Sequence, residues 1–251
     1  MPMRRLLFAA VFPVLALIPA QALAMLPMMD VYAGAYVWNA SLSGDFEYEG
    51  DEIDMDDDLD LGRERHNVFF LGVEHPVPFV PNARLRHMGL DDSARSTVEN
   101  ITFGDHTFDG DVRSEYDITM TDLSLYYGLP VPAVDVNLGL TVRALDMEVT
   151  LREQQTGIEE NVDADGVFPL VHGSVQADLP LTGLYAGAEA NIVSYSGNSL
   201  RDGRAYLGWT SDFALGVEAG LQTLRLKVDD LDDLDADIDK TGPYLGLSLR
   251  F

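Results

Sequence analysis

A histidine and a serine separated by one residue are the side chains best suited to nucleophilic catalysis. In His172-Gly173-Ser174 the two polar side chains share one face of an expected strand, because side chains alternate between faces. A histidine can activate a serine hydroxyl when an acid orients its ring, and Glu189 on the next expected strand could be that acid. No segment supplies a recognisable oxyanion hole. The pattern favours polar packing inside the fold, and a hydrolase acting on lipid or peptide is an alternative.

An acidic pair and an Asp–His pair suggest a second chemistry, the activation of water. Asp91-Asp92 and Asp105-His106 both fall in one expected loop. Adjacent residues of an extended chain point to opposite faces, so such pairs do not converge on one substrate. The spacing therefore argues against a hydrolase of this type.

Two acidic runs, within residues 54–60 and 229–239, could bind hard cations, which take oxygen ligands in loose geometry. The second run begins like a calcium-binding loop, but Lys240 stands where glycine is needed and the closing glutamate is absent. The favoured interpretation is a solvated negative rim, with no cofactor. The alternative is a Ca²⁺ site formed by Asp232, Asp235, Asp237 and Asp239.

The elements that would position these residues are strands, because apolar and polar residues alternate in segment after segment. Residues 134–144 are the clearest case: valine, leucine and alanine occupy one face, and Asp135, Asn137 and Arg143 the other. Ten such segments occur, at 31–42, 67–74, 83–90, 118–127, 134–144, 167–177, 184–192, 204–209, 213–221 and 242–251. The sequence predicts an all-β, antiparallel up-and-down fold of about ten strands.

The connections differ in length and chemistry. Four are tight and mostly rich in proline or glycine, at 75–82, 128–133, 178–183 and 210–212. The other five, at 43–66, 91–115, 145–166, 196–203 and 228–241, are mostly longer and acidic and are expected to be loops. Short turns at one end and long loops at the other are typical of a transmembrane barrel, with the short turns in the periplasm. A soluble sandwich also alternates and is the competing fold.

The two ends of the chain favour the membrane barrel. Residues 1–24 have the basic, apolar and small-residue parts of a secretory signal peptide, with cleavage expected between Ala24 and Met25. Residues 25–251 would then form the barrel domain. The last segment is apolar on one face and stops at Phe251, which is typical of the signal that the barrel-assembly machinery reads. Several aromatic residues near strand ends, among them Tyr32 and Tyr244, are expected to form interfacial girdles.

Charge excludes some functions and predicts a filled interior. The chain has 16 Lys and Arg against 42 Asp and Glu, and this excess of negative charge argues against binding to nucleic acid. The chain has no Cys, so neither disulfides nor a cysteine-based metal site can hold it together. The inward faces nevertheless carry equal numbers of basic and acidic residues. They are Arg84, Arg86, Arg143, Arg204 and Arg250, and Glu74, Asp122, Asp135, Glu189 and Glu218. Unpaired charges in a confined interior are costly, so this balance predicts an ion network that plugs the lumen.

Several motifs carry a family resemblance. They are Gly34-x-x-x-Trp38, Glu74-His75-Pro76-Val77-Pro78, Pro81-Asn82, Leu125-Tyr126-Tyr127, Asn137-Leu138-Gly139-Leu140 and Gly242-Pro243-Tyr244-Leu245-Gly246. Together they resemble a family of proteobacterial outer-membrane β-barrel proteins without an established activity. The resemblance implies a fold and an integral outer-membrane location, and it transfers no catalytic residue.

The expected function is a structural or surface-interaction role without enzyme activity. Expected partners are outer-membrane lipid, lipopolysaccharide (to which divalent ions could bridge the acidic loops) and the assembly machinery. One alternative is a narrow channel or a small-ligand-binding barrel. The other is the hydrolase.

Overall fold

The computed structural model describes residues 29–48, 52–55, 58, 62–103, 106–231 and 234–251. The expected cleavage site at Ala24 and Met25 lies outside these residues, and so does Asp232. None of the described residues forms a helix long and apolar enough to cross a membrane.

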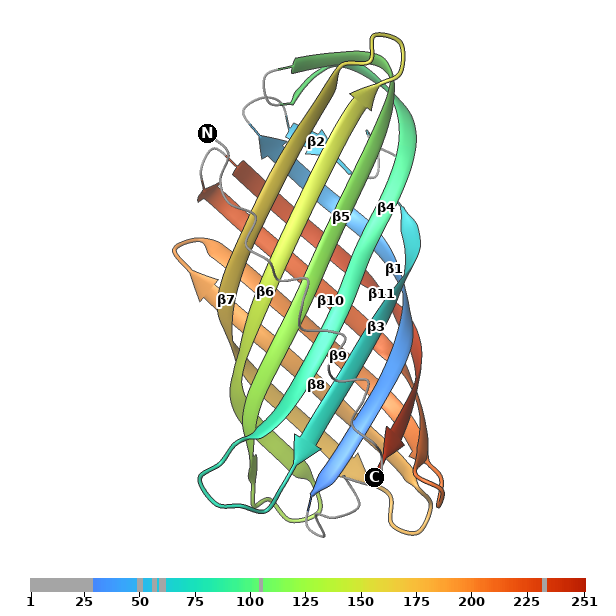
Figure 1. Cartoon of the computed structure of the whole chain (residues 1–251), viewed down its shortest axis with the longest axis vertical. Coiled ribbons are helices and arrows are strands. Elements are labelled where there is room, and N and C mark those ends of the chain that lie inside the picture. The colour runs from blue at the N-terminus through green and yellow to red at the C-terminus, as the bar shows by residue number, and fades with distance from the viewer. Residues whose placement is uncertain (1–28, 49–51, 56–57, 59–61, 104–105, 232–233) are drawn as a thin grey trace, which may run out of the picture.

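The fold is a closed antiparallel barrel, which confirms the predicted fold class. Ten long strands pair in chain order, and the last pairs with the first (Figure 1). The strands are β1 (Asp30–Tyr48), β2 (Glu52–Asp54), β3 (Arg63–Glu74), β4 (Asn82–Phe103), β5 (His106–Leu129), β6 (Asp135–Glu153), β7 (Glu159–Asp178), β8 (Leu184–Tyr195), β9 (Asn198–Thr210), β10 (Leu215–Leu231) and β11 (Leu234–Arg250). The short strand β2 is an addition to β1 and is not part of the ring.

An apolar belt surrounds the lower part of the barrel as drawn in Figure 1, at the end where β1 begins and β11 finishes. Its residues point outward at every second position, and Leu140, Leu207 and Leu245 are 57%, 70% and 61% exposed. Within the described strands no Asp, Glu, Lys or Arg interrupts the outward positions of this belt. Further members are Phe69, Leu123, Leu125, Leu138, Val142, Val171, Val175, Leu221, Leu247 and Leu249.

The expectation of long loops is largely wrong, because the strands continue beyond the belt with their faces exchanged. In β6 the outward side changes from Leu140 and Val142 to Asp146 and Glu148, while the inward side changes from Thr141 and Arg143 to leucine, methionine and valine. The backbone alternation is continuous, and only the chemistry of its two faces switches. The belt faces lipid, whereas beyond it the outer face contacts water and the inner face forms an apolar core.

The continued strands form a protruding wall, defined here as residues 89–103, 106–119, 146–153 and 159–165 of β4 to β7. Figure 1 shows these four strands rising above the rest of the barrel. Pairing between β3 and β4 stops at Val68 and Met88, and pairing between β7 and β8 stops at Val171 and Ile192. The inner side of the wall is mostly apolar, with buried Val98, Phe103, Phe108, Val112 and Leu151 packed with Ile53 of β2.

Turn chemistry explains the connections at both ends. The four tight turns each place a non-glycine residue at φ 66°, namely Phe79, Ala133, Leu181 and Ala214. The expected loop at 196–203 is instead a two-residue turn, in which Ser196 and Gly197 have φ 51° and 93°. Positive φ at both central residues is the hairpin geometry that matches the twist of the strands. β9 therefore begins at Asn198, and residues 199–203 belong to the barrel wall.

Candidate functional site

Four charged side chains meet in the middle of the lumen. Arg86 donates to Asp122 at 2.6 and 3.0 Å and to Asp202 at 2.8 Å. Arg143 donates to Asp122 at 2.7 and 2.8 Å and also to Asp202. All four side chains are at most 5% exposed. Two positive and two negative charges are thus paired away from water, which is the arrangement in which buried ions are least costly.

Neutral hydrogen bonds extend this central cluster across the barrel. Asn191 donates to Asp202 at 2.9 Å and accepts from Thr141 at 2.8 Å, and its carbonyl oxygen lies 2.9 Å from His172 Nδ1. On the opposite wall Tyr36 donates to Gln222 at 2.8 Å. Strands β4 to β9 contribute the cluster and its bonded neutral partners, and the separate Tyr36–Gln222 bond joins β1 to β10 on the facing wall.

A second chain of charges lies closer to the end that carries the tight turns. Arg84 contacts Glu189 at 2.5 Å, Glu189 contacts Arg204 at 2.9 Å, and Arg204 contacts Glu218 at 2.9 Å. Tyr244 donates to Glu218 at 2.5 Å. At the rim, Arg250 contacts Glu74 at 3.3 Å and Asp30 at 3.1 Å.

The structure therefore brings nine of the ten sequence-predicted lumen residues into ion pairs. Asp135 lies near the same end, lines the cavity described below, and forms no ion pair with a described residue. Sequence reasoning missed Asp202, because residues 196–203 were expected to be a loop. It also placed Tyr32 and Tyr244 in an interfacial girdle, whereas both point inward and contact lumen groups.

A cavity of about 740 Å³ occupies the lumen on the tight-turn side of the central cluster. Its walls carry Arg84, Glu189, Arg204 and Glu218 from the second chain and the rings of Tyr126 and Tyr206. On the other side of the cluster, Met88, Leu90, Met120 and Leu170 are at most 3% exposed. The lumen thus has a polar cavity at one end and an apolar core at the other, separated by the paired charges.

The residues that the sequence offers for hydrolysis bond to other partners in the structure. His172 bonds Asn191, and Ser174 accepts from Asn137 at 3.1 Å. Glu189, the expected orienting acid, is held by two arginines. His106 Nδ1 lies 2.6 Å from Glu160 Oε2. Asp105, the residue expected to act with His106, is outside the described residues.

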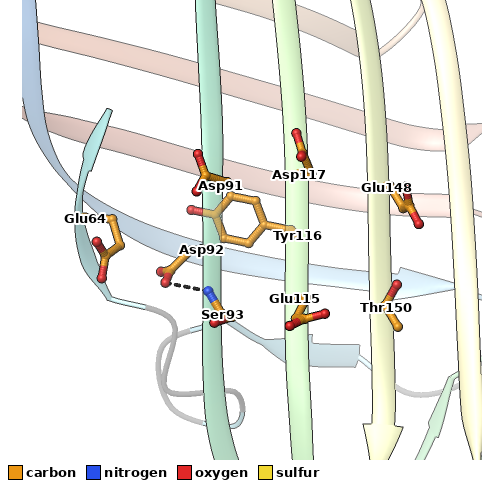
Figure 2. A pocket seen from close by; sticks show the side chains of 9 residues that line it. All are labelled: Glu64, Asp91, Asp92, Ser93, Glu115, Tyr116, Asp117, Glu148 and Thr150. Carbon is orange, nitrogen blue, oxygen red and sulfur yellow. Dashed lines mark hydrogen bonds between the residues drawn. The ribbon is translucent and has the colours of Figure 1, made fainter. Parts of the chain in front are cut away.

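An acidic groove of about 540 Å³ lies where β3 and β4 separate (Figure 2). Figure 2 shows Asp91, Asp117 and Glu148 on neighbouring strands, and Tyr116 lies in register with Asp92. Behind the groove, above the belt, buried Lys240 donates to the Tyr116 hydroxyl at 2.5 Å. Burial lowers the pKa of Lys240 to about 8, and the carboxylates of Asp92, Glu64 and Asp91 oppose that shift.

The predicted calcium ligands Asp235, Asp237 and Asp239 lie on the outer face of β11. Their spacing of two residues separates them by roughly 7 Å along the strand. Arg225 bonds Asp239, and Lys227 lies in register with Asp237. Among the described residues no three acidic, histidine or cysteine side chains gather as a metal site.

The belt and the closed ring together decide the class of protein. A barrel without an edge satisfies its backbone in lipid, and an uninterrupted apolar belt matches the hydrocarbon layer. This is an integral outer-membrane β-barrel protein. Its architecture is the one that the resemblance of the motifs implied.

The chain is similar at low identity to two solved structures. The attachment invasion locus protein Ail of Yersinia pestis is 10% identical, with 89% of this chain and 99% of that chain covered and a TM-score of 0.39. The translocator domain of the autotransporter NalP from Neisseria meningitidis is 13% identical, with 89% and 88% covered and a TM-score of 0.42. No protein-family model and no curated protein matches the chain.

Proposed function

We propose that this barrel is not an open channel but a sealed membrane anchor that displays its protruding wall for interactions at the cell surface. The observation that supports this role is the central cluster of Arg86, Asp122, Arg143 and Asp202. A hydrated ion crossing the lumen would have to separate these pairs and then enter the apolar core beyond them. Both steps are unfavourable, because each leaves a charge without a partner in a dry interior.

Planar-bilayer recording tests the proposal with the purified barrel. The parent protein is expected to show no stable, porin-like conductance. A variant that removes the cluster's largest fully buried side chain, Arg143→Ala, is expected to show more frequent current fluctuations than an Arg225→Ala variant, which changes an exposed ion pair. A large, stable conductance of the parent would contradict the proposal.

A small-ligand-binding barrel is the second candidate, and the cavity of about 740 Å³ favours it. Ligand pockets of similar size bury most of a small molecule. Native mass spectrometry of the barrel released from mild detergent would reveal a bound molecule of fixed mass. Loss of that molecule in an Arg204→Ala variant, with the barrel still folded, would place it in the cavity.

A further inference from the structure

One edge of the protruding wall lacks a neighbouring strand. β7 pairs with β6 from Glu159 to Gln176 but with β8 only from Val171 onward. β8 meanwhile turns at Ser196 and Gly197 and returns as β9. Between residues 159 and 170, no described residue forms a ladder with the free side of β7. A strand edge of this length presents unpaired N–H and C=O groups and can accept another strand.

Pro169 identifies which backbone groups face the open side. Proline has no N–H, so in a sheet it occupies a position whose N–H does not belong to a ladder. Pro169 is opposite Val142 of β6, and its nitrogen must therefore point away from β6. The side to which backbone N–H and C=O groups point alternates from one residue to the next along a strand, and the β6–β7 register has no shift that would interrupt this alternation. Free N–H and C=O groups thus belong to Glu159, Asn161, Asp163, Asp165 and Val167.

The chemistry beside this edge is strongly acidic. The same alternate residues place their side chains on the outer face, where Asp163 and Asp165 are exposed. Asp163 is directly opposite Glu148, and Glu148 opposite Asp117, which in turn is opposite Asp91. Like charges directly opposite one another across a sheet are destabilising. Neither Asp163 nor Asp165 forms an ion pair with a described residue, so basic groups would be favoured here.

The inner face of the edge has a different character. Val162 is partly buried against the apolar core, and Ala164 lies beside it on the same face. A strand added here would therefore meet carboxylates on one face and small apolar side chains on the other. Near the belt, Val167 is 68% exposed and would also be covered.

We propose that a basic extended segment of a partner protein adds to β7 as an antiparallel strand over residues 159–167. This inference rests on the proposed surface-interaction role. Alternate basic side chains of the segment would pair with Asp163 and Asp165, and the intervening apolar side chains would face Val162 and Ala164. A second copy of the chain does not fit, because antiparallel pairing of two such edges would place aspartates against aspartates.

The test uses the full barrel in lipid nanodiscs and a synthetic peptide of alternating lysine and valine. Peptide binding is expected to protect the backbone amides of Asn161, Asp163, Asp165 and Val167 from hydrogen exchange. The Asp163→Asn variant removes the charge and keeps the backbone N–H of residue 163. The Asp163→Pro variant removes the charge and that N–H as well. Like Pro169, it leaves the hydrogen bonds to β6 intact. The proline variant is expected to bind about tenfold more weakly than the asparagine variant, as for about one lost backbone hydrogen bond.

Control peptides separate strand addition from simple charge attraction. A lysine–valine peptide with alternate N-methylated amides retains its charge but cannot form the ladder, and it is expected to lose nearly all binding. Equal binding of the methylated peptide, or no protection of the four amides, would overturn the proposal. Amides that are already protected in the free barrel, whether by a second copy or by the chain's own N-terminal residues, would also overturn it. The conductance of the barrel in planar bilayers is measured separately, so a negative result with the peptides does not contradict the proposal of a sealed lumen.

Discussion

Replacing Asp202 with alanine tests the central cluster most sharply. Asp202 accepts from Arg86 at 2.8 Å, from Arg143, and from Asn191 at 2.9 Å. Its side chain is 2% exposed, so its removal would leave two arginines with Asp122 as their only carboxylate partner in the cluster. Breaking a buried pair from one side costs about 3–5 kcal/mol, because the remaining charge has no compensation. We expect a loss of that size in the free energy of unfolding.

The assay is reversible urea unfolding in detergent, followed by the fluorescence of Trp38 and Trp209. Glu115→Ala is the matched control, because Glu115 pairs with Arg113 on the surface, where each side chain is at least 39% exposed. It should cost at most about 1 kcal/mol. The double variant Arg143→Ala/Asp202→Ala restores charge balance and should cost less than the sum of the two single variants. An Asp202→Ala cost no larger than that of the control would refute a dry, paired cluster.

Three further outcomes are expected. A single Cys placed at Gly157, in the turn at the protruding end, should react with an impermeant thiol reagent on intact cells, and one at Val131 should not; the reverse labelling would invert the topology. Calcium should raise the melting temperature of the parent no more than that of a variant with asparagine at 235, 237 and 239, because Arg225 and Lys227 offset most of the negative charge on that face. A calcium-specific rise that is lost in the variant would restore the metal site. Burial lowers the pKa of Lys240 from 10.5 to about 8. Between pH 8 and 10.5 the unfolded chain therefore binds more protons than the folded chain, and the free energy of unfolding should rise with pH. A Lys240→Met variant that keeps this rise would contradict the expectation.

The alternation of the sequence was enough to predict the barrel, because a lipid-facing strand has the same pattern throughout the belt. In β6, Val136 to Val142 alternate with Asn137 to Arg143, and the structure places these two sets outside and inside. The pattern failed at the belt's edge. After Ala144 the apolar residues move to the other parity, which in a sequence is indistinguishable from the end of a strand. The acidic segments were therefore expected to be loops.

The same error affected the candidate site. Inward charges on recognised strands, such as Arg86 and Asp122, could be assigned from parity alone. Asp202 could not, because β9 was expected to begin at Arg204, and the two-residue turn at Ser196-Gly197 was not recognised. Which carboxylate each arginine contacts depends on the closure of β11 on β1 and on side-chain reach across the lumen. Neither is determined by alternation.

A crystal structure of the purified barrel in lipid, at a resolution that shows ordered water, tests the sealed lumen most directly. The cavity of about 740 Å³ should contain water up to the central cluster. No continuous water path is expected from the Arg143–Asp202 pair to the apolar core at Leu90 and Leu170. An unbroken file of water molecules passing the cluster and reaching the protruding end would contradict it.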